Sequence, residues 1–347
     1  MPNYILAIFD KTGPAPNIVY NTAPGFAYLQ EADIVDGKVD FARVGQRYGL
    51  GSPKTTFTFF GFNKDGTPNQ DYFPWKEINF SSPNPRVTGS LVQVTGQRLD
   101  SYTIQAIRNR MVPAVDNNIE NAIQGILVKE GKFLLGGRGG TDQAGTLQPV
   151  PGGSVGWKEK YIFDPFTDAF HAEAEEEAGA IGITNVKLYG IFNQVTKHIN
   201  RQWLFRGEPQ QPIDKLVENI HKGIEFYRQQ LAQGKNGREA KQALRESSFP
   251  VDAWENSDAW SFNYDSETLL RLLSDGQWLN PKGISMKLIG SLPADLYIAG
   301  AVDFGPEFKR EADKSEFVKK EVVWAATLIL GAIIIYLLRY KIYGIFR

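Results

Sequence analysis

The sequence predicts an α+β protein that ends in one transmembrane helix. Two features predict the folded part: short β-type runs separated by turn residues, and an acidic helical segment between such runs in the middle of the chain. The third feature is an uncharged apolar run, Val322–Leu338, close to the C-terminus. We therefore expect a folded α+β region followed by a membrane anchor.

The composition excludes several functional classes. The chain has 347 residues, of which 42% are hydrophobic and 22% charged, and its net charge is −1. A nearly neutral chain gives no direct signal for nucleic-acid binding. It contains no cysteine, which excludes disulfides, thiolate metal sites and a cysteine nucleophile.

Residues 1–115 are expected to form a β-rich accessory domain. The first ten residues lack the basic start of a signal peptide and predict a strand at Tyr4–Phe9. Further strands are predicted at Thr55–Phe62 and Val87–Val94, and Asp100 is a candidate cap for a helix at Ser101–Arg110. This region carries no chemical motif.

A second domain is expected over residues 116–304. Ile123–Val128 and Phe133–Leu135 predict a hairpin, which a glycine-rich loop, Gly136–Gly140, follows. An acidic helix is predicted at Asp168–Ala178, with Gly179 as its C-cap. The later elements are strands at Val186–Phe192 and Arg201–Phe205, a helical insertion at about 210–250 with a break at Gly234–Gly237, and a helix at Glu267–Leu273.

The C-terminal part predicts attachment to a membrane. Residues 305–321 are strongly charged and predict a juxtamembrane helix or linker, and residues 322–343 predict the transmembrane helix with a short tail. Membrane lipid would be the partner of Val322–Leu338, because a helix that is apolar on all sides needs lipid or a large protein core. The excess of basic residues upstream favours a single-pass, tail-anchored protein with its large domain in the cytoplasm.

A motif in the middle of the chain carries the chemistry. Gly153 is followed after five residues by Glu159, and then by Glu173-Ala174-Glu175-Glu176-Glu177-Ala178-Gly179-Ala180. This segment, together with the hairpin and the Pro-Gly-Gly approach before it, resembles the Nudix box. The resemblance implies an α/β/α sandwich with a mixed sheet. It also implies hydrolysis of a diphosphate linked to another moiety.

The spacing of the glutamates suits a divalent cation. Glu173, Glu176 and Glu177 lie at positions i, i+3 and i+4, so a helix presents them on one face, where like charges repel. Mg²⁺ or Mn²⁺ relieves this repulsion with oxygen ligands. By the resemblance, these three glutamates and the carbonyl of Gly153 hold the metal, with Glu176 and Glu177 as the catalytic residues.

Candidate substrate-binding residues follow from the same resemblance. Arg138 in the glycine-rich loop is a bidentate donor for a phosphate. If the substrate is a nucleotide diphosphate derivative, Trp203 or Phe192 is expected to stack on its base, with Tyr189 as a further candidate.

Two departures from the family pattern bear on activity. Twelve residues, Lys160 to His171, separate Glu159 from Ala172, where the family has seven. Ala172 itself stands at the position of the family's arginine, which orients the adjacent glutamate. Its loss removes a charge-assisted contact that supports the transition state.

The sequence leaves three functional hypotheses open. The first is a membrane-anchored pyrophosphohydrolase. The second is a catalytically degenerate scaffold, or an accessory subunit of a membrane protein assembly or membrane-containing particle. The third is a nucleotide sensor without turnover. A serine nucleophile at Ser154, in Gly-x-Ser-x-Gly, is disfavoured because Pro149 and Pro151 precede it where a nucleophile elbow needs a regular strand.

Overall fold

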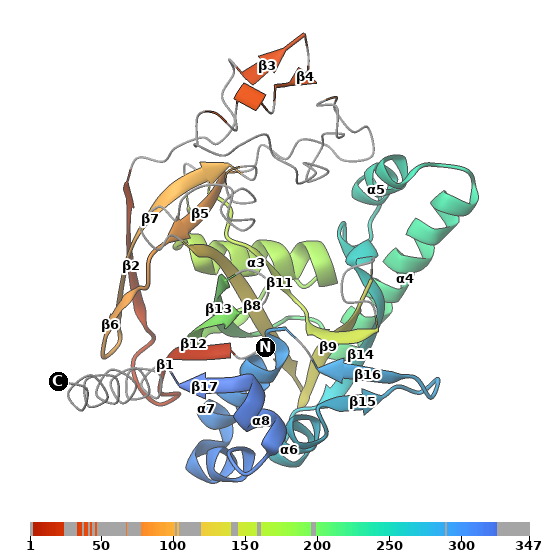
Figure 1. The fold of residues 1–347 in the computed structure, drawn as a ribbon. Helices are drawn as coiled ribbons and strands as arrows, with labels where there is room; N and C mark the ends of the chain where they lie inside the picture. Colours follow the sequence, from red (N-terminus) through yellow and green to blue (C-terminus); the bar gives the residue numbers. More distant parts are fainter. Residues whose placement is uncertain are drawn as a thin grey trace, which may run out of the picture.

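The fold is built on one mixed β-sheet with helices on both of its faces (Figure 1). The computed structural model describes residues 3–23, 33–36, 38–40, 42–43, 46, 67, 78–100, 103, 119–139, 145–157, 161–195, 199–288 and 290–324. Its main strand path runs β15-β16-β10-β9-β8-β13-β12-β1-β17. This is the layered α/β/α arrangement that the resemblance implies.

The centre of the sheet contains the strands that the sequence predicts most clearly. β8 (Ile119–Lys129) runs parallel to β13 (Ile199–Glu208), which pairs antiparallel with β12 (Thr184–Val195). β9 (Lys132–Arg138) forms the predicted hairpin with β8 through a turn at Glu130 and Gly131, where φ is 51° and 68°. The glycine-rich segment is largely strand rather than loop, because β9 extends to Arg138.

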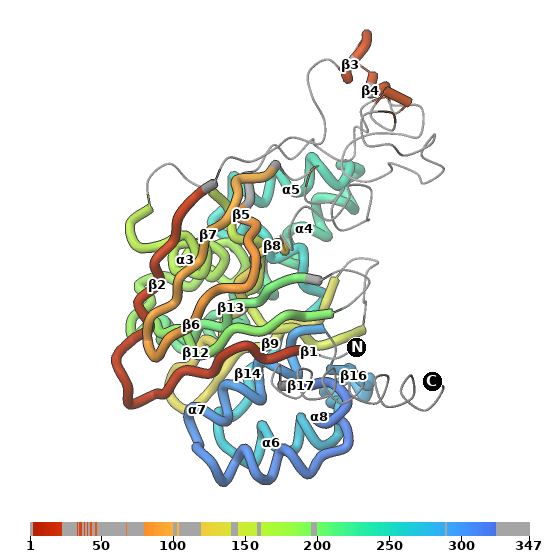
Figure 2. Tube along the Cα trace, turned by 60° about the vertical axis from the view of Figure 1, so that its left-hand side comes forward, coloured from red at the N-terminus to blue at the C-terminus, as the bar shows by residue number. Residues whose placement is uncertain are grey.

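The N-terminal strands belong to this same sheet. β1 (Asn3–Ile8) pairs with β12, and β5 (Ile78–Ser82) pairs with both β7 (Leu91–Asp100) and β8. β2 (Asn17–Ala23) and β6 (Arg86–Thr88) also pair with β7. Figure 2 shows β2, β5 and β7 as one layer beside α3. The expected boundary at residue 115 therefore does not separate two structural units.

The N-terminal strands differ from the sequence prediction in their bounds. The strand predicted at Val87–Val94 is instead the hairpin of β6 and β7, because Gly89 adopts a φ of 58° and turns the chain. The predicted strand Thr55–Phe62 lies outside the described residues, as does all of the predicted helix Ser101–Arg110 except Thr103. A separate two-stranded ribbon is formed by β3 (Ile34–Val35) and β4 (Lys38–Val39).

One face of the sheet is covered by α3 (Pro165–Ala178) and α4 (Ile213–Ala232). Phe166 and Phe170 from α3 and Leu216 and Ile220 from α4 are fully buried in this core. The short helix α5 (Gly237–Arg245) follows after a break. The predicted helices and their break are confirmed, but α4 is part of the helical layer and not an appendage to it.

The other face is covered by α6 (Ser266–Asp275), α7 (Leu292–Ala312) and α8 (Glu316–Glu321). Of the two alternatives expected for 305–321, the segment is mostly helix and not a linker, and Phe308 and Val318 are buried at 2% exposure in this core. The charged residues around them form the outer surface of two packed helices.

The remaining elements surround the sheet edge where the box lies. β10 (Thr146–Pro149) and β14 (Asn256–Asn263) flank β9, and β11 (Gly152–Ser154) pairs with β8. The 3-10 helix η2 (Ala253–Glu255) leads into β14. β15 (Gln277–Leu279) and β16 (Ser285–Leu288) form the hairpin at the outer end of the sheet.

The segment predicted to form the membrane helix begins with a β-strand. Its first three residues form β17 (Val322–Trp324), which adds to the edge of the sheet parallel to β1. Residues 325–347 lie outside the described residues. Among the helices that the structure describes, none combines the length and apolar character needed to span a bilayer.

Candidate functional site

The helix of the Nudix-like box (residues 153–180), α3, is fixed at both ends by capping residues. Asp164 Oδ1 accepts a hydrogen bond from the backbone N–H of Phe166 at 2.9 Å, and Pro165 occupies the first turn. At the other end, Gly179 adopts a φ of 65°, and its N–H donates to the Glu175 carbonyl at 2.8 Å. These two caps determine which face of the helix meets the sheet.

Glu177 lies on the buried face of α3, among its apolar residues. Its exposure is 3%, and its Oε2 accepts a hydrogen bond from the Gly152 N–H at 3.0 Å. Burial is the largest cause that raises the pKa of the Glu177 carboxyl group well above its ordinary value. The charges of Glu173 and Glu255 raise this pKa further, whereas the Gly152 N–H lowers it. A carboxylate here is stable only with a compensating positive charge.

Glu173 lies one helical turn before Glu177 and faces Gly153. A Cβ atom built on Gly153 would overlap the Glu173 carboxyl group. Glycine at this position therefore lets the backbone of β11 approach the carboxyl group closely. Backbone and carboxylate oxygens are brought together here, which is the donor chemistry that hard divalent cations bind.

Glu176 differs from the other two box glutamates because its side chain is exposed. Its backbone carbonyl accepts a hydrogen bond from the Asp252 N–H at 2.8 Å, which attaches η2 to α3. Glu177 is thus buried, Glu173 half-buried and Glu176 exposed, and their joint role as metal ligands stays a prediction. Within the described ranges, no three acidic or histidine side chains form a group able to hold a metal ion as they stand.

Two further carboxylates reach the site from η2. Burial, followed by the charge of Asp252, raises the pKa of Glu255 above its ordinary value, and Arg138 and Lys241 lower it. Glu255 in turn raises the pKa of Glu177. Residues that are distant in sequence therefore extend the acidic cluster of the box.

A polar cleft opens beside Glu177. Its empty space, counted out to its open mouth, is about 480 Å³. Strands β8, β9, β10, β11 and β12 contribute to its walls, and so do α3 and the segment that leads into α7. Its lining residues are Gln124, Arg138, Thr146, Leu147, Gln148, Pro149, Gly152, Glu177, Gln194, Gly290 and Ser291.

Arg138 lies in this cleft, as the sequence predicts for a substrate-binding residue. Its Nη1 donates to Gln148 Oε1 at 2.9 Å, and Gln148 Nε2 donates to Asn256 Oδ1 at 2.9 Å. Gly136 permits this arrangement, because a Cβ atom there would overlap the Asn256 side chain. The guanidinium group is thus oriented on the same wall as the Glu177 carboxyl group.

Comparisons with known proteins are limited in what they show. No protein-family model and no curated protein matches the chain. Among solved structures, a mutant of the Bacillus subtilis pyrophosphohydrolase BsRppH is 15% identical, with a TM-score of 0.26, over 46% of this chain and 71% of that one. A NUDIX hydrolase from Nitrosomonas europaea is 18% identical, with a TM-score of 0.23, over 27% of this chain and 60% of that one. At these scores, the similarity carries no argument about function.

The two aromatic residues predicted to stack on a base are not available to a ligand. Trp203 is fully buried, lies 3.8 Å from the ring centroid of Phe166, and donates from Nε1 to Asn121 Oδ1 at 2.9 Å. Phe192 is fully buried in the opposite core. The expectation is wrong because both residues sit on central strands whose two faces are covered by helices. Tyr189 is also buried and donates to Asp303 Oδ1 at 2.9 Å.

The departures from the family pattern lie in α3 and in the segment before it. Ala172 is half-buried, and Glu159 lies outside the described residues. Ala172 lies in the middle of α3, which begins at Pro165. His171 stacks with Phe163 at 5.5 Å between ring centroids, so its ring is used in packing and does not replace the missing arginine.

Ser154 has a partner that is inconsistent with a nucleophile. Its hydroxyl donates to Glu120 Oε1 at 2.7 Å, and the residue lies on the short strand β11. A nucleophile elbow would place the serine on a tight turn between a strand and a helix. The place of Ser154 on a strand therefore does not match a nucleophile elbow.

Sequence reasoning missed most of the polar wall of the cleft. Asp252 and Glu255 gave no signal, because only folding brings η2 next to α3. Gln124 did give one, since it is a polar residue inside the apolar run Ile123–Val128. A polar residue within a central strand indicates either a buried hydrogen-bond network or a site.

Proposed function

We propose that this cleft hydrolyses a diphosphate linked to another moiety, with the help of a divalent metal ion. The observation that carries the proposal is Glu177, a buried carboxyl group at the wall of a polar cleft with the acidic residues Glu173 and Glu255 around it. Functional sites characteristically hold such perturbed groups. The polar lining of the cleft and the resemblance to the Nudix box support the same chemistry.

The donor chemistry of this cluster suits Mg²⁺ or Mn²⁺. Glu173 and Glu177, with the backbone of Gly153, would hold the cation, and Glu176 would have to turn from the surface to join them. When bound, such a cation offsets negative charge on a diphosphate. Arg138 orients a phosphate at the same wall, while the Gly152 N–H holds the Glu177 carboxyl group in place.

The test is metal-dependent turnover by the full-length chain in detergent. The whole chain is used because a shorter one ending at residue 320 would lack β17. ADP-ribose, UDP-glucose and diadenosine tetraphosphate are incubated with Mg²⁺ or Mn²⁺, and the products are separated by chromatography. We expect turnover with at least one of them and a loss of about 100-fold or more in Glu177→Gln.

Glu175→Gln provides the matched control, because Glu175 is exposed on the same helix. It removes the same charge from α3 and is expected to leave turnover within about twofold of the wild type. Equal loss in both variants, or no turnover with any substrate, would contradict the proposal.

A second candidate function is a non-catalytic scaffold or accessory subunit in a membrane protein assembly or membrane-containing particle. Ala172, which stands where the family has its arginine, and the exposed Glu176 favour it. In that case the folded chain binds no Mn²⁺ at the box, and Ala172→Arg restores neither binding nor turnover.

We also propose that the chain is held at a membrane, with the folded part in the cytoplasm. The support is the sequence: residues 325–338 carry no charge, and with snorkelling of Arg339 and Lys341 the helix 325–343 would span about 28 Å. A chain that ends after Trp324 keeps β17 and loses this segment. We expect the full chain to float with phospholipid vesicles in a density gradient and the shortened chain not to; equal behaviour of the two would refute the anchor.

A further inference from the structure

Three glutamine side chains form a hydrogen-bonded ladder whose two ends line the cleft. Gln124, Gln202 and Gln194 come from the neighbouring strands β8, β13 and β12. Gln124 Nε2 donates to Gln202 Oε1 at 3.2 Å, and Gln202 Nε2 donates to Gln194 Oε1 at 3.0 Å. The amides thus connect three strands in a single line, which we call the amide ladder.

The position of the amide ladder is unusual for a purely structural network. Gln202, its central member, is 3% exposed, so both of its bonds replace contacts with water. The two end members, Gln124 and Gln194, line the cleft together with Glu177 and Arg138. A network that only satisfied buried groups would not need both ends at a cleft.

The ends of the amide ladder have opposite hydrogen-bonding character. Over the described residues, neither Gln124 Oε1 nor Gln194 Nε2 takes part in a further hydrogen bond. One end therefore offers an acceptor and the other a donor. Reversing all three amides exchanges the two ends but keeps one acceptor and one donor, since each amide donates from nitrogen and accepts at oxygen.

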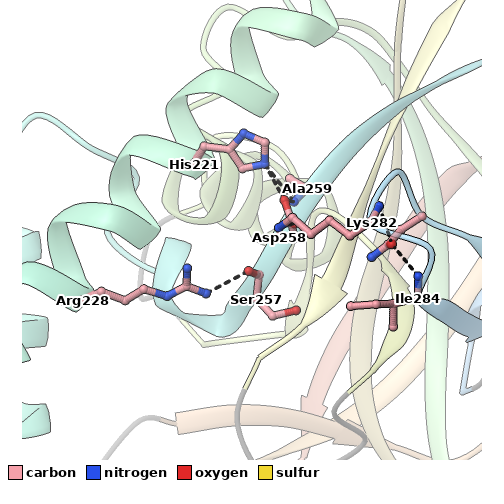
Figure 3. A network of polar contacts seen from close by, with 8 residues as sticks. His221, Arg228, Ser257, Asp258, Ala259, Lys282 and Ile284 are labelled. Carbon is pink, nitrogen blue, oxygen red and sulfur yellow. Dashed lines mark hydrogen bonds and ion pairs between the residues drawn. The ribbon is translucent and has the colours of Figure 1, made fainter.

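A second row of polar side chains runs from the cleft-lining residues Arg138 and Gln148 to Asn256. Asn256, which accepts from Gln148, is 2% exposed, and its Nδ2 has no hydrogen-bond partner. The start of β14 that carries Asn256 is fastened to α4 and to the β15–β16 turn (Figure 3). There, His221 Nε2 lies 2.7 Å from Asp258 Oδ1, and Lys282 donates to Asp258 Oδ2 at 2.9 Å. The start of β14 is therefore held by side-chain contacts from two neighbouring elements.

We propose that the amide ladder binds the uncharged part of the ligand and determines which diphosphate compounds are accepted. This inference rests on the proposed function, in which the diphosphate lies at Arg138 and Glu177. The ligand group at the ladder must carry both a donor and an acceptor. Either the edge of a nucleobase or the hydroxyl groups of a sugar provides this chemistry.

The test measures binding of three probes to the full-length chain in detergent with Mg²⁺, by isothermal titration calorimetry. Inorganic pyrophosphate has no uncharged group, ribose 5-diphosphate adds a sugar, and ADP adds a base to that sugar diphosphate. We expect at least one of the two larger probes to bind about tenfold or more tightly than pyrophosphate. Tighter binding of ADP than of the sugar diphosphate identifies the base as the group at the ladder; equal binding identifies the sugar.

Gln194→Leu removes one end of the ladder from the side of the cleft. We expect it to weaken binding of the preferred probe about 3- to 10-fold, as expected for one or two neutral hydrogen bonds, and to leave pyrophosphate binding unchanged. Gln202→Leu breaks both bonds and is expected to have the same selective effect. If Gln202→Leu fails to fold, Gln194→Leu still decides the question.

Gln93→Leu is the matched control, because Gln93 is an exposed strand residue on β7 away from the cleft lining. It should leave binding of all three probes unchanged. The inference is overturned if the wild type binds all three equally, or if Gln194→Leu weakens pyrophosphate as much as the larger probes. A wild type that binds no pyrophosphate refutes the proposed function itself, whereas pyrophosphate binding without a ladder effect refutes only this inference.

Discussion

Two glycines at the site lead to a paired prediction that separates folding from ligand binding. In Gly153→Ala, the new methyl group overlaps the carboxyl group of Glu173, which is the free end of a flexible side chain. In Gly125→Ala, the methyl group lies 2.6 Å from Phe170 Cε2 and 2.7 Å from Pro151 Cδ. Those two groups are buried in the core and cannot move away. The same chemical change therefore meets a movable group in one case and a rigid one in the other.

The expected magnitudes follow from that difference. Overpacking at Gly125 should lower the free energy of unfolding by about 1–3 kcal/mol. At Gly153 the carboxyl group turns away, so stability should change by less than about 1 kcal/mol, while Mn²⁺ binding weakens about 10- to 100-fold because Glu173 no longer faces the β11 backbone.

Urea denaturation and Mn²⁺ titration followed by electron paramagnetic resonance measure the two quantities on each variant. Gly125→Ala serves as the control for a change that acts through stability. If Gly153→Ala binds Mn²⁺ as the wild type does, the close approach of Glu173 to Gly153 has no role in the site. If it is destabilised as much as Gly125→Ala, the carboxyl group is not movable, and the reasoning fails.

Three further predictions concern residues around the site. Trp203→Phe loses the hydrogen bond to Asn121 and should lower stability by about 1–3 kcal/mol in urea denaturation without changing ADP binding; weaker ADP binding at unchanged stability would show that Trp203 contacts the ligand. Asp295 is fully buried, and neither of its carboxyl oxygens has a hydrogen bond of ordinary geometry, so burial raises its pKa well above the ordinary value although the Ser291 hydroxyl partly offsets this. Because the pKa of Asp295 is higher in the folded state than in the unfolded state, its contribution to stability is present below the unfolded pKa and is lost as pH rises. Asp295→Asn should therefore raise the free energy of unfolding by about 1–3 kcal/mol at pH 8 and change it less at pH 4. An equal effect at both pH values would contradict this prediction. Ala172→Arg restores a charge next to Glu173 and should raise turnover about tenfold if the site is catalytic; unchanged turnover in a folded variant would mean that the missing arginine does not limit activity.

Much of the site could be predicted because its signals are local in sequence. The run of glutamates ending at Gly179 gave the helix, its C-cap and the two carboxylates at the cleft. The start of the helix was placed too late, although Asp164-Pro165 is a capping signal in the sequence. The helix consequently begins three residues earlier than predicted, at Pro165.

The errors have a common physical cause, which is tertiary packing that local patterns do not encode. Residues 305–321 read as a charged linker because charged residues outnumber apolar ones, yet Phe308 and Val318 are enough to anchor two helices. Gly136 and Gly137 read as loop residues, but they are strand positions where the Asn256 and Trp260 side chains come close. The pairing of β1 with β12 joins segments from the two sides of the predicted domain boundary. Pairing between segments that are distant in sequence cannot be read from a local sequence pattern.

The most direct test of the central claim follows the oxygen atom that hydrolysis adds to the product. The full-length chain is incubated with Mg²⁺ and a diphosphate substrate in water enriched in oxygen-18, and the phosphate-containing products are weighed by mass spectrometry. We predict products that carry one heavy oxygen from the wild type and a rate at least about 100-fold lower from Glu177→Gln. The absence of labelled product from the wild type, or an equal rate of labelling in Glu177→Gln, would contradict the account.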